Sequence, residues 1–183
     1  MSGSRAAENV DGARVCHVIQ GDFHVSDDPG IMMTTILGSC VATCLCDPVA
    51  RVGGMNHFLL PQGSSSDGSG YRYGLLAMEL LINGLLKKGA SKTRLEAKLF
   101  GGARMNDSLA RIGEANSAFA LDFLRAEGIR CLSQSLGGSR ARRIRYVPTT
   151  GAAQQRVLAD HADPAPALAP RPSAGSDDNV TLF

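Results

Sequence analysis

The stretch TTILGSCVATCLCDPVARVGGMNHFLLP, residues 34–61, carries the clearest structural pattern in the chain. Small, apolar and β-branched residues favour strands in three segments of this region: 31–35, 40–46 and 55–60. Glycine-containing turns separate these segments, LGS at 37–39 and GG at 53–54. The short connection after the second segment predicts a hairpin-like return, which lays 55–60 alongside 40–46.

Two helices are predicted outside this stretch. Apolar residues at helical spacing indicate one helix over 75–88 and another over 114–127. A glycine follows each pattern, as is common just beyond the C-terminus of a helix. Further strands are predicted at 15–26, at 95–99 and on both sides of the glycine pair 137–138. Many strands, two helices and short connections place the chain in the α/β class.

Composition predicts one globular domain with polar ends. The chain has 183 residues, 44% hydrophobic and 20% charged, with a net charge of +2, so nothing favours nucleic acid as a partner. No apolar run approaches the ~18 residues of a membrane span, which predicts no membrane insertion. We expect a mobile leader at 1–14, a domain at 15–160 and a disordered Pro/Ala-rich tail at 161–183. The last five residues, NVTLF, are more apolar than such a tail requires.

Three of the five cysteines lie close together, at 40, 44 and 46. A zinc site normally needs a second pair of ligands, and His57 has no neighbouring ligand in the sequence. We therefore predict no metal and no cofactor. Two cysteines at alternate positions of a strand lie about 6.7 Å apart, at the upper edge of the Cα separations that a disulfide spans. The odd number of cysteines also favours free thiols in a reducing compartment.

The remaining alternatives are buried cysteines and a nucleophile. For Cys44 and Cys46 the pattern favours small, buried, unreactive side chains. Cys40 differs because it follows Gly38-Ser39, where a tight turn can leave backbone N–H groups unpaired near the sulfur. A thiol needs a base, and His57 on the returning strand is the candidate. From spacing alone, His57 fits equally well as an ordinary sheet residue.

Several motifs, in the same order, resemble the CheD family of chemoreceptor glutamine deamidases. These motifs are TTILGSCVA, DPVARVGGMNHFLLP, EAKLFGGARM, IGEANSAFALDFLRAEGI and LGGSRARRIRYVPTTG. The resemblance spans about 30–151, which is most of the expected domain. It implies a layered α/β fold with a β-sheet core and two helices outside, similar to the catalytic domain of the deamidating cytotoxic necrotizing factors.

The resemblance also implies an activity and its residues. Members are cytoplasmic protein-glutamine glutaminases of bacterial chemotaxis, which convert receptor glutamines to glutamate and release ammonia through a thioester. Motif matching places the catalytic residues at Cys40, His57 and Thr34, with no cofactor. Thr35 lies beside Thr34 but on the opposite face of the predicted strand. One position departs from the family pattern, since Ser135 stands where an acidic residue is expected before LGG.

Partners follow from the same resemblance. Methyl-accepting chemoreceptors are the implied substrates, and a CheC-type phosphatase is a second implied partner. The alternative function is a non-catalytic regulatory module that acts on such a phosphatase. An arginine cluster (140, 142, 143 and 145) suits either acidic receptor helices or an ordinary solvated strand edge. The NVTLF segment suits a short motif that binds a partner.

Overall fold

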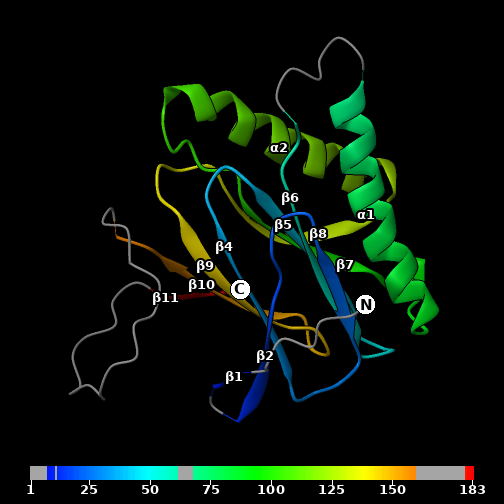
Figure 1. Cartoon of the computed structure of the whole chain (residues 1–183). Coiled ribbons are helices and arrows are strands. Elements are labelled where there is room, and N and C mark those ends of the chain that lie inside the picture. The colour runs from blue at the N-terminus through cyan, green and yellow to red at the C-terminus, as the bar shows by residue number, and fades with distance from the viewer. Residues whose placement is uncertain (1–7, 11, 62–67, 160–179) are drawn as a thin grey trace, which may run out of the picture.

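The computed structural model describes residues 8–10, 12–61, 68–159 and 180–183 (Figure 1). Within these residues the chain forms eleven strands, two α-helices and one 3-10 helix, at Lys92–Arg94. The strands build two sheets that pack face to face, and the helices cover the outer face of one of them. The predicted α/β fold, with a layered β core and two helices outside, is confirmed. No helix in this part of the chain combines the length and the apolar character that crossing a bilayer requires.

The first sheet has six strands in the order β1-β2-β4-β9-β10-β11. Their bounds are β1 Glu8–Val10, β2 Ala13–His17, β4 Ile31–Leu37, β9 Arg142–Val147, β10 Ala152–Val157 and β11 Val180–Leu182. The second sheet has five strands in the order β3-β6-β5-β7-β8. Their bounds are β3 Phe23–Ser26, β6 Val52–Phe58, β5 Val41–Asp47, β7 Glu96–Gly101 and β8 Arg130–Leu136. The helices are α1 Ser69–Lys87 and α2 Asp107–Ala126.

Two hydrophobic cores hold the layers together. One lies between the sheets and includes Met33, Ala42, Met55 and Tyr146. The other lies between the second sheet and the helices, around side chains such as Leu81. Every residue of β5 and β6 is buried, because both faces of these strands are covered. Because both faces of β5 are buried, the cysteine-rich segment consists of small and apolar residues without a polar face.

The predicted hairpin is present. β5 and β6 pair antiparallel from Val41 with Phe58 to Asp47 with Val52, which brings the two conspicuous segments side by side. Residue 40 lies just outside the strand, at the end of the turn that precedes β5. Sequence patterning therefore located this pair of strands, but β5 begins one residue later than predicted. β6 starts at Val52 and ends at Phe58, so Gly53 and Gly54 lie within the strand and not in the predicted turn.

Both helices begin earlier than the apolar pattern indicates, α1 at 69 rather than 75 and α2 at 107 rather than 114. The first turns contain glycines, which read as helix breakers. Gly74 is needed for packing, since a Cβ there would lie 2.6 Å from the ring of Phe119. A Cβ on Gly113 would lie 2.6 Å from the carbonyl oxygen of Gly102. Gly74 thus lets α1 approach α2 closely, and Gly113 lets α2 approach the segment that follows β7.

Short strands are present near both ends of the chain. β1 lies within the expected leader, and β11 lies at the end of the expected tail, where it pairs with β10. Phe183 exchanges two backbone hydrogen bonds with Ala153, of 2.8 and 3.1 Å, and its ring packs edge-on against Phe100 at 5.3 Å. The NVTLF segment thus ends on the protein's own sheet. Residues 160–179, to which the disorder prediction chiefly applies, lie outside the described residues.

Candidate active site

Cys40 lies at the edge of the space between the two sheets. It ends the turn from β4 to β5, is partly exposed, and contacts the core between the sheets. The turn is fixed by three hydrogen bonds to its carbonyl oxygens: Ala103 N to Gly38 O at 2.8 Å, Asn116 Nδ2 to Ser39 O at 2.9 Å, and Gly102 N to Cys40 O at 2.8 Å. Among the described residues, the N–H groups of Ser39 and Cys40 donate to no backbone carbonyl, and the Cys40 N–H interacts with its own sulfur. They are available to a bound oxyanion.

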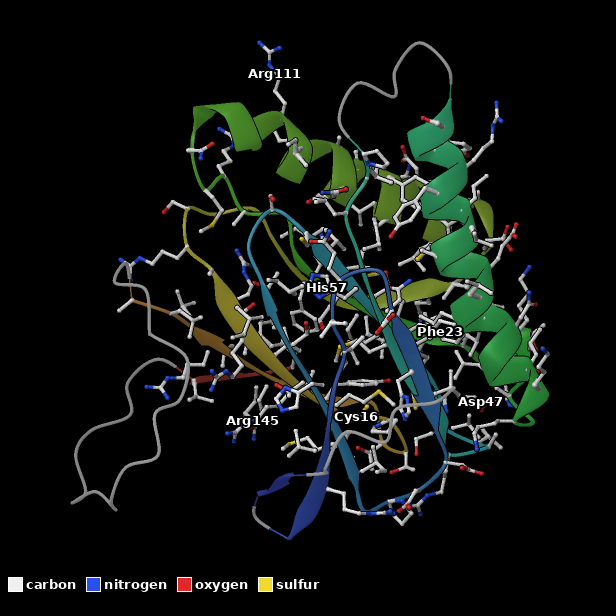
Figure 2. All side chains as sticks on the ribbon, in the orientation of Figure 1. Cys16, Phe23, Asp47, His57, Arg111 and Arg145 are labelled. Atoms are coloured by element: carbon white, nitrogen blue, oxygen red, sulfur yellow. The ribbon has the colours of Figure 1, made fainter. Side chains whose placement is uncertain are left out.

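His57 lies on β6, opposite Ala42 in the register of the hairpin. Cys40 is two residues before Ala42 and packs against the core between the sheets, so it lies at the same end of the hairpin as His57 and on the same side of the second sheet. This face looks toward the first sheet, because Ala42 and Met55 both belong to the core between the sheets. Figure 2 shows His57 at the end of the β5–β6 pair opposite Asp47.

The hydrogen bonds of His57 fix its tautomer. Nδ1 lies 2.9 Å from Thr35 Oγ1 and 3.3 Å from the carbonyl oxygen of Val18. Thr35 donates its only hydroxyl hydrogen to the same Val18 oxygen, at 2.7 Å, so toward His57 the hydroxyl can only accept. Both neighbours of Nδ1 are therefore acceptors, and Nδ1 carries the proton.

The opposite ring nitrogen is the free one. Nε2 is buried and has no hydrogen-bond partner among the described residues. Since the proton is on Nδ1, the lone pair of Nε2 is available as a base. Such an orphaned, buried acceptor costs stability, and enzymes commonly tolerate that cost at a functional atom.

The electrostatic setting favours neutral groups. Burial lowers the pKa of His57, although the hydrogen bond to Val18 acts in the opposite direction. Burial also raises the pKa of the Cys40 thiol, opposed by its own backbone N–H. The resting pair is therefore a neutral thiol and a neutral imidazole, rather than a preformed thiolate and imidazolium.

Gln20 is a site residue that sequence reasoning missed. The Cys40 thiol donates to Gln20 Oε1 at 3.3 Å. The turn that carries Gln20 is bound to the backbone of His57 on both sides, Gly21 N to His57 O at 2.7 Å and His57 N to Asp22 O at 3.0 Å. The sequence contains one relevant signal, the glycine at 21, whose φ of 90° permits this turn.

The two adjacent threonines make different contacts. Thr34 donates its hydroxyl to Ile144 O at 2.8 Å, and its carbonyl oxygen accepts from Val18 N at 2.9 Å. Neither group of Thr34 contacts His57, whereas the hydroxyl of Thr35 does. The two threonines do lie on opposite faces of β4, as strand alternation requires. The face toward His57 is that of Met33 and Leu37, which belongs to Thr35.

Cys44 and Cys46 have buried, unreactive settings. Burial raises the pKa of the Cys46 thiol to about 11 and holds that of Cys44 well above its ordinary value. All five cysteines are free thiols. In the described ranges, no three His, Cys, Asp or Glu side chains converge as a metal site would require. Cys40 is the only one of the three clustered cysteines outside β5.

The arginine cluster is not a uniform surface. Arg142 is buried and donates to Ser135 O at 2.7 Å, to Ser135 Oγ at 3.0 Å and to Gly137 O. Its guanidinium thus fixes the turn after β8, and the small hydroxyl of Ser135 is part of that arrangement. An open hollow of about 720 Å³ lies beside this turn and extends to Gly102, which holds the Cys40 carbonyl.

The chain is similar to proteins of one family. A family model described as CheD chemotactic sensory transduction matches residues 59–157. A Caulobacter sp. (strain K31) protein is 52% identical over 183 residues, covering 96% of this chain and 97% of its own. A Cereibacter sphaeroides protein is 59% identical over 144 residues, covering 79% and 72%. Both carry the name "Probable chemoreceptor glutamine deamidase CheD". A solved Neisseria meningitidis structure of family DUF152 aligns with a TM-score of 0.49 and 12% identity, over 75% and 76% of the two chains.

Proposed function

The chain belongs to the CheD family, and we propose that it is a cytoplasmic deamidase that converts chemoreceptor glutamine side chains to glutamate and releases ammonia. One observation carries the proposal: the unpartnered Nε2 lone pair of His57, on the same sheet face as the partly exposed Cys40 thiol. A buried base without a partner beside an accessible thiol is the arrangement that nucleophilic attack on an amide requires.

The first step is attack with simultaneous proton transfer. The Cys40 thiol gives its proton to His57 Nε2 as the sulfur bonds to the carboxamide carbon. General-base transfer suits this site because burial holds both groups neutral at rest. Negative charge develops on the carboxamide oxygen, where the N–H groups of Ser39 and Cys40 can donate to it. Loss of one such donor typically lowers kcat by about 10²–10³-fold.

The second step releases ammonia. Nε2–H of the imidazolium protonates the departing amino group, and a thioester between Cys40 and the substrate remains. His57 then takes a proton from water, which attacks the thioester and releases glutamate and the thiol. Throughout, the Nδ1 proton points to Thr35 Oγ1 and Val18 O, which orient the ring and stabilise its positive charge. We therefore propose Thr35, in place of Thr34, as the third member of the site.

Mass spectrometry of a receptor fragment tests the proposal directly. Incubation with the wild type should convert particular glutamines to glutamate, and Cys40→Ala should abolish this conversion while the protein stays folded. Cys131→Ala is the matched control, because Cys131 is also a partly buried free thiol but lies on β8. Deamidation that persists in Cys40→Ala would remove this sulfur from the reaction. Equal losses in both variants would also contradict its role.

A CheC-type phosphatase remains a proposed partner. Binding of such a phosphatase by Cys40→Ala, measured alongside the deamidation assay, would separate a binding role from catalysis. A protein that binds the phosphatase but never deamidates a receptor fragment would favour the regulatory alternative.

A further inference from the structure

Asn116 joins the two segments that carry the proposed nucleophile and base. It lies on α2 and is completely buried. Its Nδ2 donates to Ser39 O at 2.9 Å, one residue before Cys40, and its Oδ1 accepts from Leu60 N at 2.8 Å, three residues after His57. Both sides of the amide are used, which also fixes its orientation.

The position of this amide in the hairpin is informative. The ladder between β5 and β6 ends at Val41 with Phe58. In a continued register, Cys40 would pair with Leu59, and Ser39 with Leu60. The Asn116 carboxamide contains a C=O and an N–H like a peptide group, and it binds the carbonyl of Ser39 and the N–H of Leu60. It therefore stands where the next rung of the ladder would form.

We propose that Asn116 is a positioning residue that ends the hairpin at the active site, and this rests on the proposed deamidase function. By bonding to Ser39 O and Leu60 N, the amide keeps the two segments from pairing with each other beyond Val41 and Phe58. Separation leaves the N–H of Ser39, which would otherwise pair with Leu60 O in the next rung, available to the oxyanion. It also holds the Cys40 turn at a fixed place relative to His57.

The packing of α2 supports this role. Asn116 has a short side chain, so the helix must lie close to the turn for its amide to reach. Gly113, one turn earlier, permits this: a Cβ at 113 would lie 2.6 Å from Gly102 O and 2.7 Å from Ala103 O. The residues at 102 and 103 are the same ones whose N–H groups hold the carbonyls of Cys40 and Gly38. Helix α2 therefore contacts the Cys40 turn directly through Asn116, and contacts the residues that hold this turn through Gly113.

Asn116→Asp is the most specific test. The aspartate side chain has nearly the same shape as asparagine and keeps an oxygen that accepts from Leu60 N. Its carboxylate has no hydrogen to donate to Ser39 O and repels that oxygen. We expect kcat to fall by about 10²-fold, the usual effect of a small misplacement of reacting groups, with KM nearly unchanged. The rate of Cys40 alkylation, read by peptide mass spectrometry against Cys131 in the same sample, should change as well. At low pH the protonated acid can donate to Ser39 O, so the difference from wild type should shrink.

Asn56→Asp is the matched control. Asn56 is 1% exposed; its Oδ1 accepts from Thr43 N at 3.0 Å, and its Nδ2 donates to Ala77 O at 3.1 Å, which joins α1 to the sheet. The chemical change and the burial are the same, without a contact to the turn. A larger loss of kcat in Asn116→Asp than in Asn56→Asp, at similar thermal stability, supports the proposal. Equal losses, or an unchanged kcat in Asn116→Asp, overturn it.

A second variant covers failure to fold. Asn116→Ala leaves room for water in place of the amide, and it should show the same loss of kcat without recovery at low pH. Wild-type Cys40 reactivity and kcat in this variant would also overturn the proposal. The alkylation assay needs no receptor, so it tests Asn116 even if deamidation is absent.

Discussion

At the scale of single residues, the site depends on which atoms face the imidazole. Sequence motifs placed Cys40 and His57 in paired segments, and the hairpin register brings them to one face. They pointed to Thr34, whereas Thr35 is the residue that contacts His57, because alternation separates two adjacent residues without telling which one faces inward. The core around Met33 and Leu37 settles that question, and it forms only when the two sheets pack.

Thr35→Val should lower kcat substantially, because His57 Nδ1 loses its nearest acceptor and the ring loses its orientation. Thr34→Val is the matched control: it removes a hydrogen bond to Ile144 O at the cost of about 1 kcal/mol of stability, and activity should remain. Steady-state deamidation and urea unfolding of both variants provide the comparison. Activity lost in Thr34→Val and retained in Thr35→Val would reverse the assignment.

Gln20→Ala should increase the rate at which iodoacetamide alkylates Cys40. The carboxamide of Gln20 accepts from the thiol, which favours the protonated form and covers the sulfur. Gln154→Ala on β10 is the control, since Gln154 is an exposed glutamine on the other sheet. Unchanged or slower alkylation in Gln20→Ala would show that this contact does not restrain the thiol.

At the scale of elements, the strands could be predicted and the helix starts could not. The segments that form β5 and β6 are buried on both faces, so their composition alone indicates strands. The first turns of α1 and α2 contain glycines that sequence rules treat as interruptions, whereas packing requires them. Propensity describes an isolated helix, and close packing overrides it here.

Gly113→Ala tests whether packing outweighs helix propensity, because the two effects change the free energy of unfolding in opposite directions. Helix propensity alone predicts a gain of about 1 kcal/mol. Packing predicts a loss of about 1–3 kcal/mol, since the added Cβ would overlap the carbonyl oxygens of Gly102 and Ala103. Urea unfolding gives the answer. A more stable variant would contradict the close packing of α2 against the turn.

At the scale of the whole molecule, the layers are joined at both ends of the β5–β6 pair. One end carries the site, and the other carries Asp47, which is fully buried. Its carboxylate accepts from Val49 N and Ala50 N at 3.0 Å, Ser91 N at 2.8 Å and the guanidinium of Arg94 at 2.8–3.1 Å. These bonds tie the hairpin to the segment after α1. No sequence motif indicated the bonds from Ser91 and Arg94, because these partners lie more than forty residues from Asp47.

Asp47 should make stability depend on pH. Burial alone would raise its pKa, but the hydrogen bonds from Arg94, Ser91, Ala50 and Val49 outweigh this effect and hold the pKa well below its ordinary value. The folded pKa is thus lower than the unfolded one, so the contribution is complete above about pH 4 and is lost as pH falls. Asp47→Asn should lose roughly 1.5–3 kcal/mol at pH 7 and show a flatter acid limb in urea unfolding. An unchanged acid limb would contradict this role.

The proposed mechanism depends on His57 being a neutral base, with its proton on Nδ1 and a free lone pair on Nε2 that accepts the proton of Cys40. Nitrogen-15 NMR of the labelled imidazole, in wild-type protein from pH 5 to 8, observes both nitrogens directly. We predict a protonated Nδ1 and an unprotonated Nε2 at pH 7, with a midpoint below the ordinary histidine value of about 6.5, because burial lowers the pKa. A proton on Nε2, or an imidazolium paired with a thiolate at pH 7, would contradict the account.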